Sequence, residues 1–190
     1  MSYKLPTAID KVKLTYIYFV IGDCVEQILK GFFTGVVHHH RYYAVNRYTS
    51  TIHVFVYTSK WKQRYSWSVD TRKGYTSLGI ANNQLYACLQ DYHIINIFSL
   101  SGLFKYGTGS KGSGGPGEFN SPLICATDTA GDVLIADYSN DRLQLLKANG
   151  QWSIVQLQPP VKNPWGACFM NETLYVSKHY NDTLLAYKME

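Results

Sequence analysis

The sequence predicts an all-β chain built from repeated antiparallel meanders. In the stretch from Gly107 to Trp152, three short apolar runs are separated by turn signals at residues 130–132, 139–141 and 148–150. Runs of strand length with tight turns between them are typical of a meander. A single meander cannot bury both of its faces, so it must stack on copies of itself or close into a ring.

Copies of this unit are visible along the chain. Similar apolar tripeptides place their third residue at positions 44, 87, 136 and 176, which gives spacings of 43, 49 and 40 residues. A second β-rich run begins seven or eight residues after each of these positions. A period of roughly 40–50 residues with several strands per unit is typical of the blades of a β-propeller. A β-sandwich is the alternative, because sandwiches also place turns at similar intervals.

Each unit is expected to contain up to four strands, A to D in chain order. In the first unit they are expected near residues 34–37, 42–47, 52–57 and 64–69. The fourth unit stops after its C strand, at Tyr187. We expect a propeller domain over residues 33–190, preceded by an N-terminal segment of residues 1–32. Its four repeats are expected at about residues 33–71, 75–118, 119–158 and 162–190.

The strand missing from the fourth unit could come from the beginning of the chain. Residues 13–20 form a strong β run outside the four units. If this run pairs with residues 184–187, it gives four blades of four strands and covers open edges. The alternative is an open part of a six-bladed ring, whose free edges would favour self-association. One short helix is expected between Asp23 and Lys30, from an Asp-x-x-Glu pattern followed by Gly31.

Two motifs in the third unit resemble an NHL repeat. They are Gly-Glu-Phe-Asn-Ser-Pro at residues 117–122 and Asp-Tyr-Ser-Asn-Asp-Arg-Leu-Gln at residues 137–144. The fourth unit is similar, from Asn-Pro-Trp-Gly at residues 163–166 onward. The resemblance covers roughly residues 33–189 and is strongest over residues 107–189.

The resemblance to NHL domains, which usually have six blades, implies a recognition role. Such domains commonly form the recognition ends of tripartite-motif ubiquitin ligases, and some bind single-stranded RNA. It also implies mainly structural roles for three residues: Asp137 and Asn140 would shape the turn between strands B and C, and Arg142 would pack between blades. Because the sequence contains no RING, B-box or coiled coil, the recognition role is carried over without ligase activity.

The turns between strands B and C indicate a candidate binding surface. One tyrosine lies in or beside each of these B–C turns, and a propeller places all of them on one face. Aromatic side chains among cations can stack nucleic-acid bases or grip a peptide, although tyrosines can also simply cap turns. The candidate ligand-binding residues are Arg47, Tyr48, Tyr92, Lys111, Tyr138, Arg142, Lys178 and Tyr180.

Two further motifs resemble functional sites but also have ordinary structural interpretations. Residues 107–112 match GxGxxG, but a dinucleotide site needs a following helix, and more glycine, a proline and an expected strand follow here. We therefore expect an inter-blade loop, in which Lys111 and backbone N–H groups could still contact an anion. The histidines at residues 38–40 suggest a metal ligand set, but their expected place in a turn favours solvated side chains.

No pattern in the sequence is typical of an enzyme. No triad spacing, paired carboxylate motif or nucleophile elbow occurs. NHL-like propellers include the metal-dependent lyase that completes peptide amidation, whose metal is held by histidines from several blades. Here His93 and His179 alone fall on the expected face, which is too few for zinc without other ligands. We expect a non-catalytic module without metal or cofactor, and keep the lyase as an alternative.

Composition limits the partners. The 190 residues carry a formal net charge of +5 and 16% charged residues, which excludes a disordered chain and permits an acidic partner without requiring one. Cys24, Cys88, Cys125 and Cys168 form no CxxC pair, and no signal peptide or membrane span is evident. We expect a cytoplasmic protein that binds a protein partner, with single-stranded RNA as the alternative.

Overall fold

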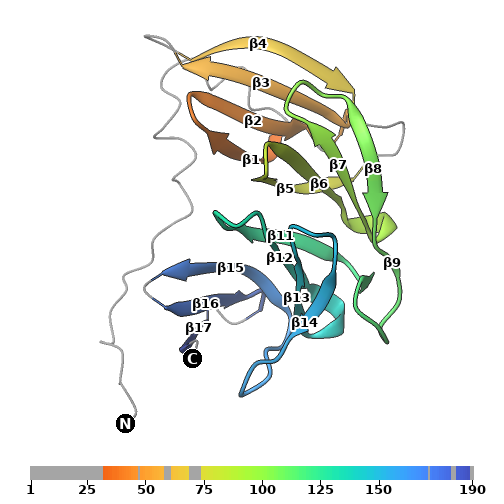
Figure 1. Ribbon diagram of the computed structural model, residues 1–190, viewed down its shortest axis with the longest axis vertical. Coiled ribbons are helices and arrows are strands. Elements are labelled where there is room, and N and C mark those ends of the chain that lie inside the picture. Colours follow the sequence, from red (N-terminus) through yellow and green to blue (C-terminus); the bar gives the residue numbers. More distant parts are fainter. Residues whose placement is uncertain are drawn as a thin grey trace.

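Four antiparallel sheets follow one another along the chain in the computed structural model (Figure 1). The structure describes residues 32–46, 48–57, 61–68, 74–170, 172–180 and 183–188. The sheets are the blades of a β-propeller, which confirms the predicted all-β, four-blade architecture over the sandwich alternative. The expected strand at residues 13–20, the expected helix at residues 23–30 and the candidate residue Arg47 lie outside the described residues.

Each blade is a meander in which hydrogen-bonded neighbours are also neighbours in sequence. Blade 1 contains β1 (Phe32–His38), β2 (Arg41–Asn46), β3 (Thr51–Tyr57) and β4 (Trp61–Ser68). Blade 2 contains β5 (Tyr75–Ala81), β6 (Gln84–Leu89), β7 (Ile94–Ser99) and β8 (Phe104–Thr108). Blade 3 contains β11 (Pro122–Thr127), β12 (Val133–Asp137), β13 (Arg142–Leu146) and β14 (Trp152–Val155). Blade 4 contains β15 (Pro164–Met170), β16 (Thr173–Lys178) and β17 (Leu184–Lys188).

The connection between blades 2 and 3 forms a small sheet of its own. Strand β9 (Ser110–Lys111) pairs in parallel with β10 (Glu118–Phe119), and the glycine-rich loop runs between them. Strand β11 follows directly, with no helix after the GxGxxG motif. The expected inter-blade loop is therefore confirmed, and the dinucleotide interpretation lacks the helix it requires.

The B strands described in blades 1, 2 and 3 are buried along most of their length. Residues 42–45 of β2, 85–89 of β6 and 133–137 of β12 are all buried. Tight turns join neighbouring strands. In the turn between β5 and β6, Asn82 and Asn83 have positive φ angles of 47° and 54°, as a type I′ hairpin requires.

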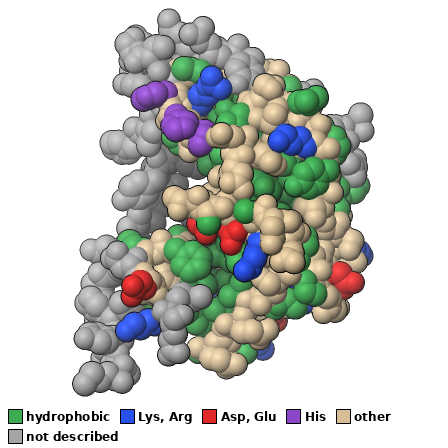
Figure 2. All heavy atoms as spheres, in the orientation of Figure 1, with side chains coloured by type: hydrophobic (Ala, Val, Ile, Leu, Met, Phe, Trp, Pro, Cys, Tyr) green, Lys and Arg blue, Asp and Glu red, His purple; other side chains and the backbone are tan. Residues whose placement is uncertain are grey.

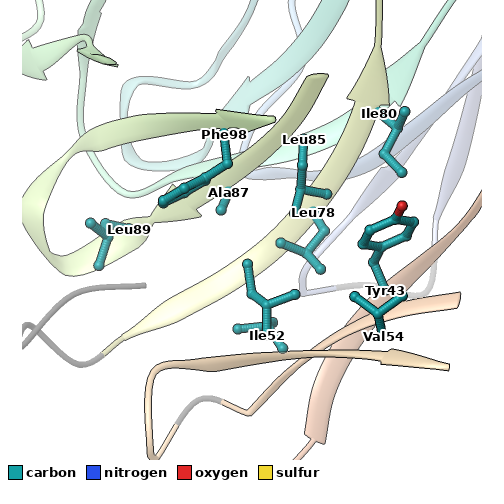
Figure 3. Close-up of a cluster of buried hydrophobic side chains, with 10 residues drawn as sticks. Tyr43, Ile52, Val54, Leu78, Ile80, Leu85, Ala87, Leu89 and Phe98 are labelled. Carbon is teal, nitrogen blue, oxygen red and sulfur yellow. The ribbon is translucent and has the colours of Figure 1, made fainter. Parts of the chain in front are cut away.

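Three apolar clusters hold successive blades together. Figure 3 shows the first, in which Tyr43, Ile52 and Val54 of blade 1 face Leu78 and Leu85 of blade 2. Corresponding clusters join blade 2 to blade 3 and blade 3 to blade 4. Each fully buried aliphatic or aromatic side chain contributes about 1.5–3 kcal/mol relative to an exposed one, so these interfaces dominate the stability of the fold.

The described part of the molecule forms an arc of blades. The A strands pack in sequence, β1 against β5, β5 against β11 and β11 against β15. Within the described ranges, no packing of comparable extent joins β15 to β1 (Figure 1). Blade 4 shows three strands there, which leaves β17 at the edge of its sheet, and Phe169, Met170 and Leu184 of this blade are exposed.

Candidate functional site

The B–C turns of blades 2 and 3 share one backbone conformation, and a meander places all B–C turns at one edge of the blades. A 3₁₀ turn follows β6 (η2, Gln90–Tyr92) and another follows β12 (η3, Tyr138–Asn140). The next residue is left-handed in each case, namely His93 with φ 59° and Asp141 with φ 55°. Ser50, which precedes β3 in blade 1, has φ 52°. In a meander, the connections between blades lie at this same edge, and the A–B and C–D turns lie at the opposite edge.

Two of these left-handed residues connect their blade to the next one. His93 Nδ1 accepts a hydrogen bond from the Ser121 N–H at 3.0 Å, and Asp141 Oδ1 accepts one from the Asn163 N–H at 2.7 Å. Each donor immediately precedes the proline that opens the next blade. Burial and the nearby Lys111 ammonium lower the pKa of His93, which favours the neutral ring that can accept this bond.

Asp137 organises the B–C turn of blade 3. Its fully buried carboxylate accepts the Asn120 N–H at 2.7 Å through Oδ1. Through Oδ2 it accepts the Asn140 amide at 2.9 Å, the Arg142 Nε–H at 2.8 Å and the Gln144 amide at 2.9 Å. The carboxylate therefore fixes three side chains around one turn.

Those three side chains in turn hold the glycine-rich loop. Asn140 donates to the Gly112 carbonyl at 2.8 Å, and Gln144 donates to the Glu118 carbonyl at 2.6 Å. Arg142 Nη2 donates to the Gly115 carbonyl at 3.1 Å and to the Glu118 carbonyl at 2.9 Å. Because the Arg142 guanidinium is engaged on both Nε and Nη2, we leave this candidate out of the binding surface.

The backbone N–H groups of the loop already have an anion. Glu118 Oε2 accepts the N–H groups of Gly114 at 2.8 Å and Gly115 at 3.1 Å. These two hydrogen bonds are the main cause that lowers the pKa of Glu118, with a smaller contribution from the Arg142 charge. The nest of N–H groups that could cradle an external anion is occupied by the chain's own carboxylate.

The four candidate tyrosines occupy different positions in their turns. Counting from the end of the B strand, Tyr138 is the first turn residue, Tyr48 and Tyr180 are the second, and Tyr92 is the third. Tyr48 is 72% exposed, Tyr180 65% and Tyr92 45%. The structure brings Tyr138 and Tyr180 together, whereas Tyr48 and Tyr92 belong to the turns of blades 1 and 2.

Four aromatic rings form one contiguous cluster across blades 3 and 4. The Tyr138 ring lies edge to face against Trp165 at 5.8 Å and against His179 at 5.4 Å between centroids. The His179 ring lies 4.3 Å from Trp165 and 4.4 Å from Tyr180. A hydrogen bond with the Tyr180 side chain, more than burial, raises the pKa of Tyr138 to about 12. We call these four residues the aromatic cluster.

Trp165 and His179 are the members that sequence reasoning missed as binding candidates. Trp165 follows the proline that opens β15 and is 37% exposed. Its place in the repeat gave a usable signal, because the corresponding position of blade 3 is the buried Leu123. Another blade has a smaller, buried residue at this position. A large aromatic side chain here therefore indicates a role other than packing in the core.

The candidate lysines lie apart from each other in the fold. Lys111 is exposed in β9, beside the glycine-rich loop. Lys178 is half-buried at the end of β16 and immediately precedes His179 of the aromatic cluster. Of the two, Lys178 is therefore the one that belongs to the same part of the surface.

Metal or thiol chemistry gains no support from the described residues. Within them, no group of three or more His, Cys, Asp or Glu side chains is placed to hold a metal ion. Cys88, Cys125 and Cys168 are free thiols in strands, and burial raises the pKa of the Cys88 and Cys125 thiols, which disfavours the reactive thiolate. No helix in these ranges is long and apolar enough to cross a membrane.

Comparison with known proteins establishes the fold. A scan against protein-family models and a search of curated protein sequences give no match. Among solved structures, the chain is similar to a streptogramin B lyase, with 15% identity over 84% of this chain and 55% of that one, at a TM-score of 0.58. It is also similar to a protein of unknown function from Bacteroides thetaiotaomicron, with 16% identity over 78% of this chain and 44% of that one, at a TM-score of 0.63.

A third similar structure is the glutaminyl cyclase of Myxococcus xanthus, with 14% identity over 83% of this chain and 66% of that one, at a TM-score of 0.56. These neighbours are β-propeller proteins. The chain spans about half the length of the first two. At such identities the similarity concerns the fold, and the lyase and cyclase activities belong to the neighbours.

Proposed function

We propose that the chain is a non-catalytic, NHL-type propeller module that recognises a protein partner through the aromatic cluster at its B–C edge. The observation that carries this proposal is the cluster itself. Tyr138, Trp165, His179 and Tyr180 come from two consecutive blades and form one continuous set of rings, of which Trp165 and Tyr180 are substantially exposed.

The physical reasons favour a protein ligand. Tyr and Trp are enriched among the residues that dominate protein interfaces, because they bury a large rigid surface and keep a polar group for hydrogen bonding. The edge-to-face contacts hold the rings of the cluster against one another, which lowers the entropy lost on binding. Isolated exposed aromatics are ordinary on protein surfaces, but a contiguous set at one edge is typical of a contact site.

The charges near the cluster argue against RNA as the main ligand. RNA affinity comes largely from several cations facing phosphates. Of the described basic candidates, Arg142 is engaged by Asp137 and by the loop carbonyls, and Lys111 lies in β9 beside the glycine-rich loop. Lys178 is adjacent to the cluster and the exposed Lys162 precedes Trp165 by three residues, whereas Asp141 follows Tyr138 by three residues. Two lysines beside a carboxylate are few cations for a polyanion, so the local charges suit a peptide better.

The NHL-type assignment is supported by the polar network of blade 3. Asp137, Asn140 and Arg142 are the residues that the repeat resemblance marked as structural, and their side chains meet at one carboxylate. The same network tethers the glycine-rich loop that leads into the repeat motif. If the chain has NHL-type repeats, its motif residues should make structural contacts of this kind.

The proposal is tested by selecting peptides from a displayed random library on the full chain and measuring their affinities by fluorescence anisotropy. Tyr180→Ala and Trp165→Ala should each weaken the selected peptides about 30-fold or more, as expected for interface hot spots worth about 2 kcal/mol. Tyr106→Ala is the matched control, because Tyr106 is an exposed tyrosine of β8 in blade 2. It should leave the affinity unchanged.

A single-stranded RNA oligonucleotide titrated at two salt concentrations separates the rival ligand class. Tight RNA binding that falls steeply with salt and is lost in Tyr92→Ala and Tyr180→Ala would replace the protein proposal with the RNA alternative. Peptides that bind equally well to wild type, Tyr180→Ala and Trp165→Ala would show that the aromatic cluster is not the recognition site.

A further inference from the structure

A pocket lies at the opposite edge of the blades, between blades 1 and 2. It has a volume of 470 Å³ and is lined by residues 38–41, Tyr43, Val56, Asn83 and Leu100. Residues 39–40 form the A–B turn of blade 1, and Asn83 belongs to the A–B turn of blade 2. Figure 2 shows histidine side chains gathered beside a basic side chain over the blade 1 end of the molecule. Because A–B turns and B–C turns lie at opposite edges, this pocket is separate from the aromatic cluster.

The lining of the pocket combines apolar surface with several hydrogen-bonding side chains and one permanent cation. Three consecutive imidazoles and the Arg41 guanidinium come from blade 1, and the Asn83 amide comes from blade 2. No acidic side chain is among the described residues that line it. Val56, Leu100 and the Tyr43 ring add apolar surface. The sequence predicts a solvated turn at residues 38–40, and the structure shows in addition that these residues border a pocket.

Tyr43 contributes a buried polar group that the rest of the described structure does not satisfy. The side chain is fully buried, and its hydroxyl has no hydrogen-bond partner among the described residues. Figure 3 shows the hydroxyl end of the ring directed away from Val54 and toward Ile80. Buried hydroxyls are nearly always hydrogen bonded, so the Tyr43 hydroxyl is a candidate donor to a molecule bound in this pocket.

We propose that this pocket binds a small organic anion that has an apolar body. The anionic group would be held by the imidazoles of His38 and His39 and by Arg41, and it would accept a hydrogen bond from the Tyr43 hydroxyl. The apolar body would pack on Val56 and Leu100. The volume lies within the range of natural small-molecule sites, which combine apolar walls with a few convergent polar groups.

The charges around the pocket lead to a second prediction, which concerns the pH dependence of binding. Burial and the neighbouring His39 and Arg41 charges lower the pKa of His38, so a proton on this ring is disfavoured. A bound anion reverses that balance, and binding should therefore be accompanied by proton uptake. The charged and titratable groups that line the pocket are His38, His39, His40, Arg41 and Tyr43, whereas the lining residues from β3 and blade 2 are uncharged. Affinity should rise as pH falls toward the lowered pKa of His38, because protonation of this ring favours a bound anion.

The test uses phenylacetate as the probe, with benzyl alcohol as its neutral analogue, and isothermal titration calorimetry on the full chain at pH 6 and pH 8. The carboxylate stays ionised at both values, so a pH effect belongs to the protein. We expect phenylacetate to bind at least tenfold more tightly than benzyl alcohol, and at least tenfold more tightly at pH 6 than at pH 8. The double variant His38→Gln, His39→Asn should lose both preferences, and Asn suits the left-handed φ of 53° at position 39.

Tyr43→Phe tests the proposed hydroxyl contact directly. Since the hydroxyl lacks a partner in the described part of the chain, its removal should leave the thermal unfolding midpoint unchanged or raise it, while phenylacetate binding weakens several-fold. Lys147→Gln is the control, because it removes one exposed positive charge from the C–D turn of blade 3. It should bind as wild type does.

Three results would overturn the proposal: phenylacetate binding no tighter than benzyl alcohol binding, an affinity independent of pH, or a double variant that binds as wild type does. If Lys147→Gln weakens phenylacetate binding as much as the double variant does, the attraction is a nonspecific effect of net charge. Unchanged phenylacetate affinity in Tyr43→Phe would remove the hydroxyl contact from the site.

Discussion

Some side chains stabilise the turns, and others are exposed on the turns and available for contacts. Asp137 belongs to the first kind, because its buried carboxylate satisfies a backbone N–H and three side chains. Tyr180 belongs to the second, since its ring is mostly exposed and contacts the ring of its neighbour His179. The distinction matters for mutagenesis, because a change of the first kind alters stability and a change of the second kind alters recognition.

Asp137→Ala should destabilise the protein by about 3–5 kcal/mol, because it leaves the half-buried Arg142 charge and several donors without their acceptor. Asp128→Ala is the matched control. Asp128 is exposed in the A–B turn of blade 3 and accepts the Asp132 N–H at 2.8 Å, so its loss should cost about 1 kcal/mol. Urea unfolding of both variants measures the difference. A cost for Asp137→Ala below that of Asp128→Ala would show that the carboxylate does not hold the network.

Sequence reasoning at this scale succeeded where a residue acts within its own turn. The repeat motif was enough to mark Asp137, Asn140 and Arg142 as mainly structural, and their contacts agree with that role. It missed Trp165, although the contrast with the buried Leu123 at the same position of blade 3 was a usable signal. It could not find the orphan hydroxyl of Tyr43, because the surroundings of that hydroxyl depend on which blades face each other.

At the scale of elements, the B–C turns hold the four candidate tyrosines at different positions. In a 3₁₀ turn each residue is rotated by about 120° from the one before, so a shift of one position redirects the side chain. Tyr138 and Tyr92 stand at the first and third positions of η3 and η2. The turns themselves were predictable from tight-turn residues, but the direction of each ring depended on its position within the turn.

The joints between blades give an element-scale prediction about pH. His93 has a pKa below its usual value of 6.5 in the folded protein, so its contribution to stability is complete above pH 6.5 and is lost as pH falls through the lower folded value. His93→Asn keeps an acceptor for the Ser121 N–H and suits the left-handed φ, but it does not titrate. The free energy of unfolding, measured in urea at pH 5, 6 and 7, should fall less steeply toward acid in the variant than in wild type. Equal slopes would show that His93 protonation does not loosen the joint.

For the whole molecule, the arc of blades raises the question of how its ends are completed. Three apolar interfaces serve four blades within the described ranges, and β17 is an edge strand there. Exposed apolar side chains such as Phe169, Met170 and Leu184 lie on this last blade. A sheet edge that stays uncovered is a template for pairing with another chain. The strand run at residues 13–20 therefore remains our proposal for the fourth strand of blade 4.

Deletion of residues 1–22 tests that proposal at the scale of the whole molecule. If residues 13–20 pair with β17, the shortened chain exposes a complete row of unpaired backbone groups beside Leu184, and it should form dimers or larger species. Size-exclusion chromatography with light scattering measures the change against the full chain. Adding Leu184→Lys to the shortened chain should return it to a monomer, because a charged side chain on an edge strand disfavours strand addition. A shortened chain that is monomeric and unfolds at the same urea concentration as the full chain would exclude this pairing.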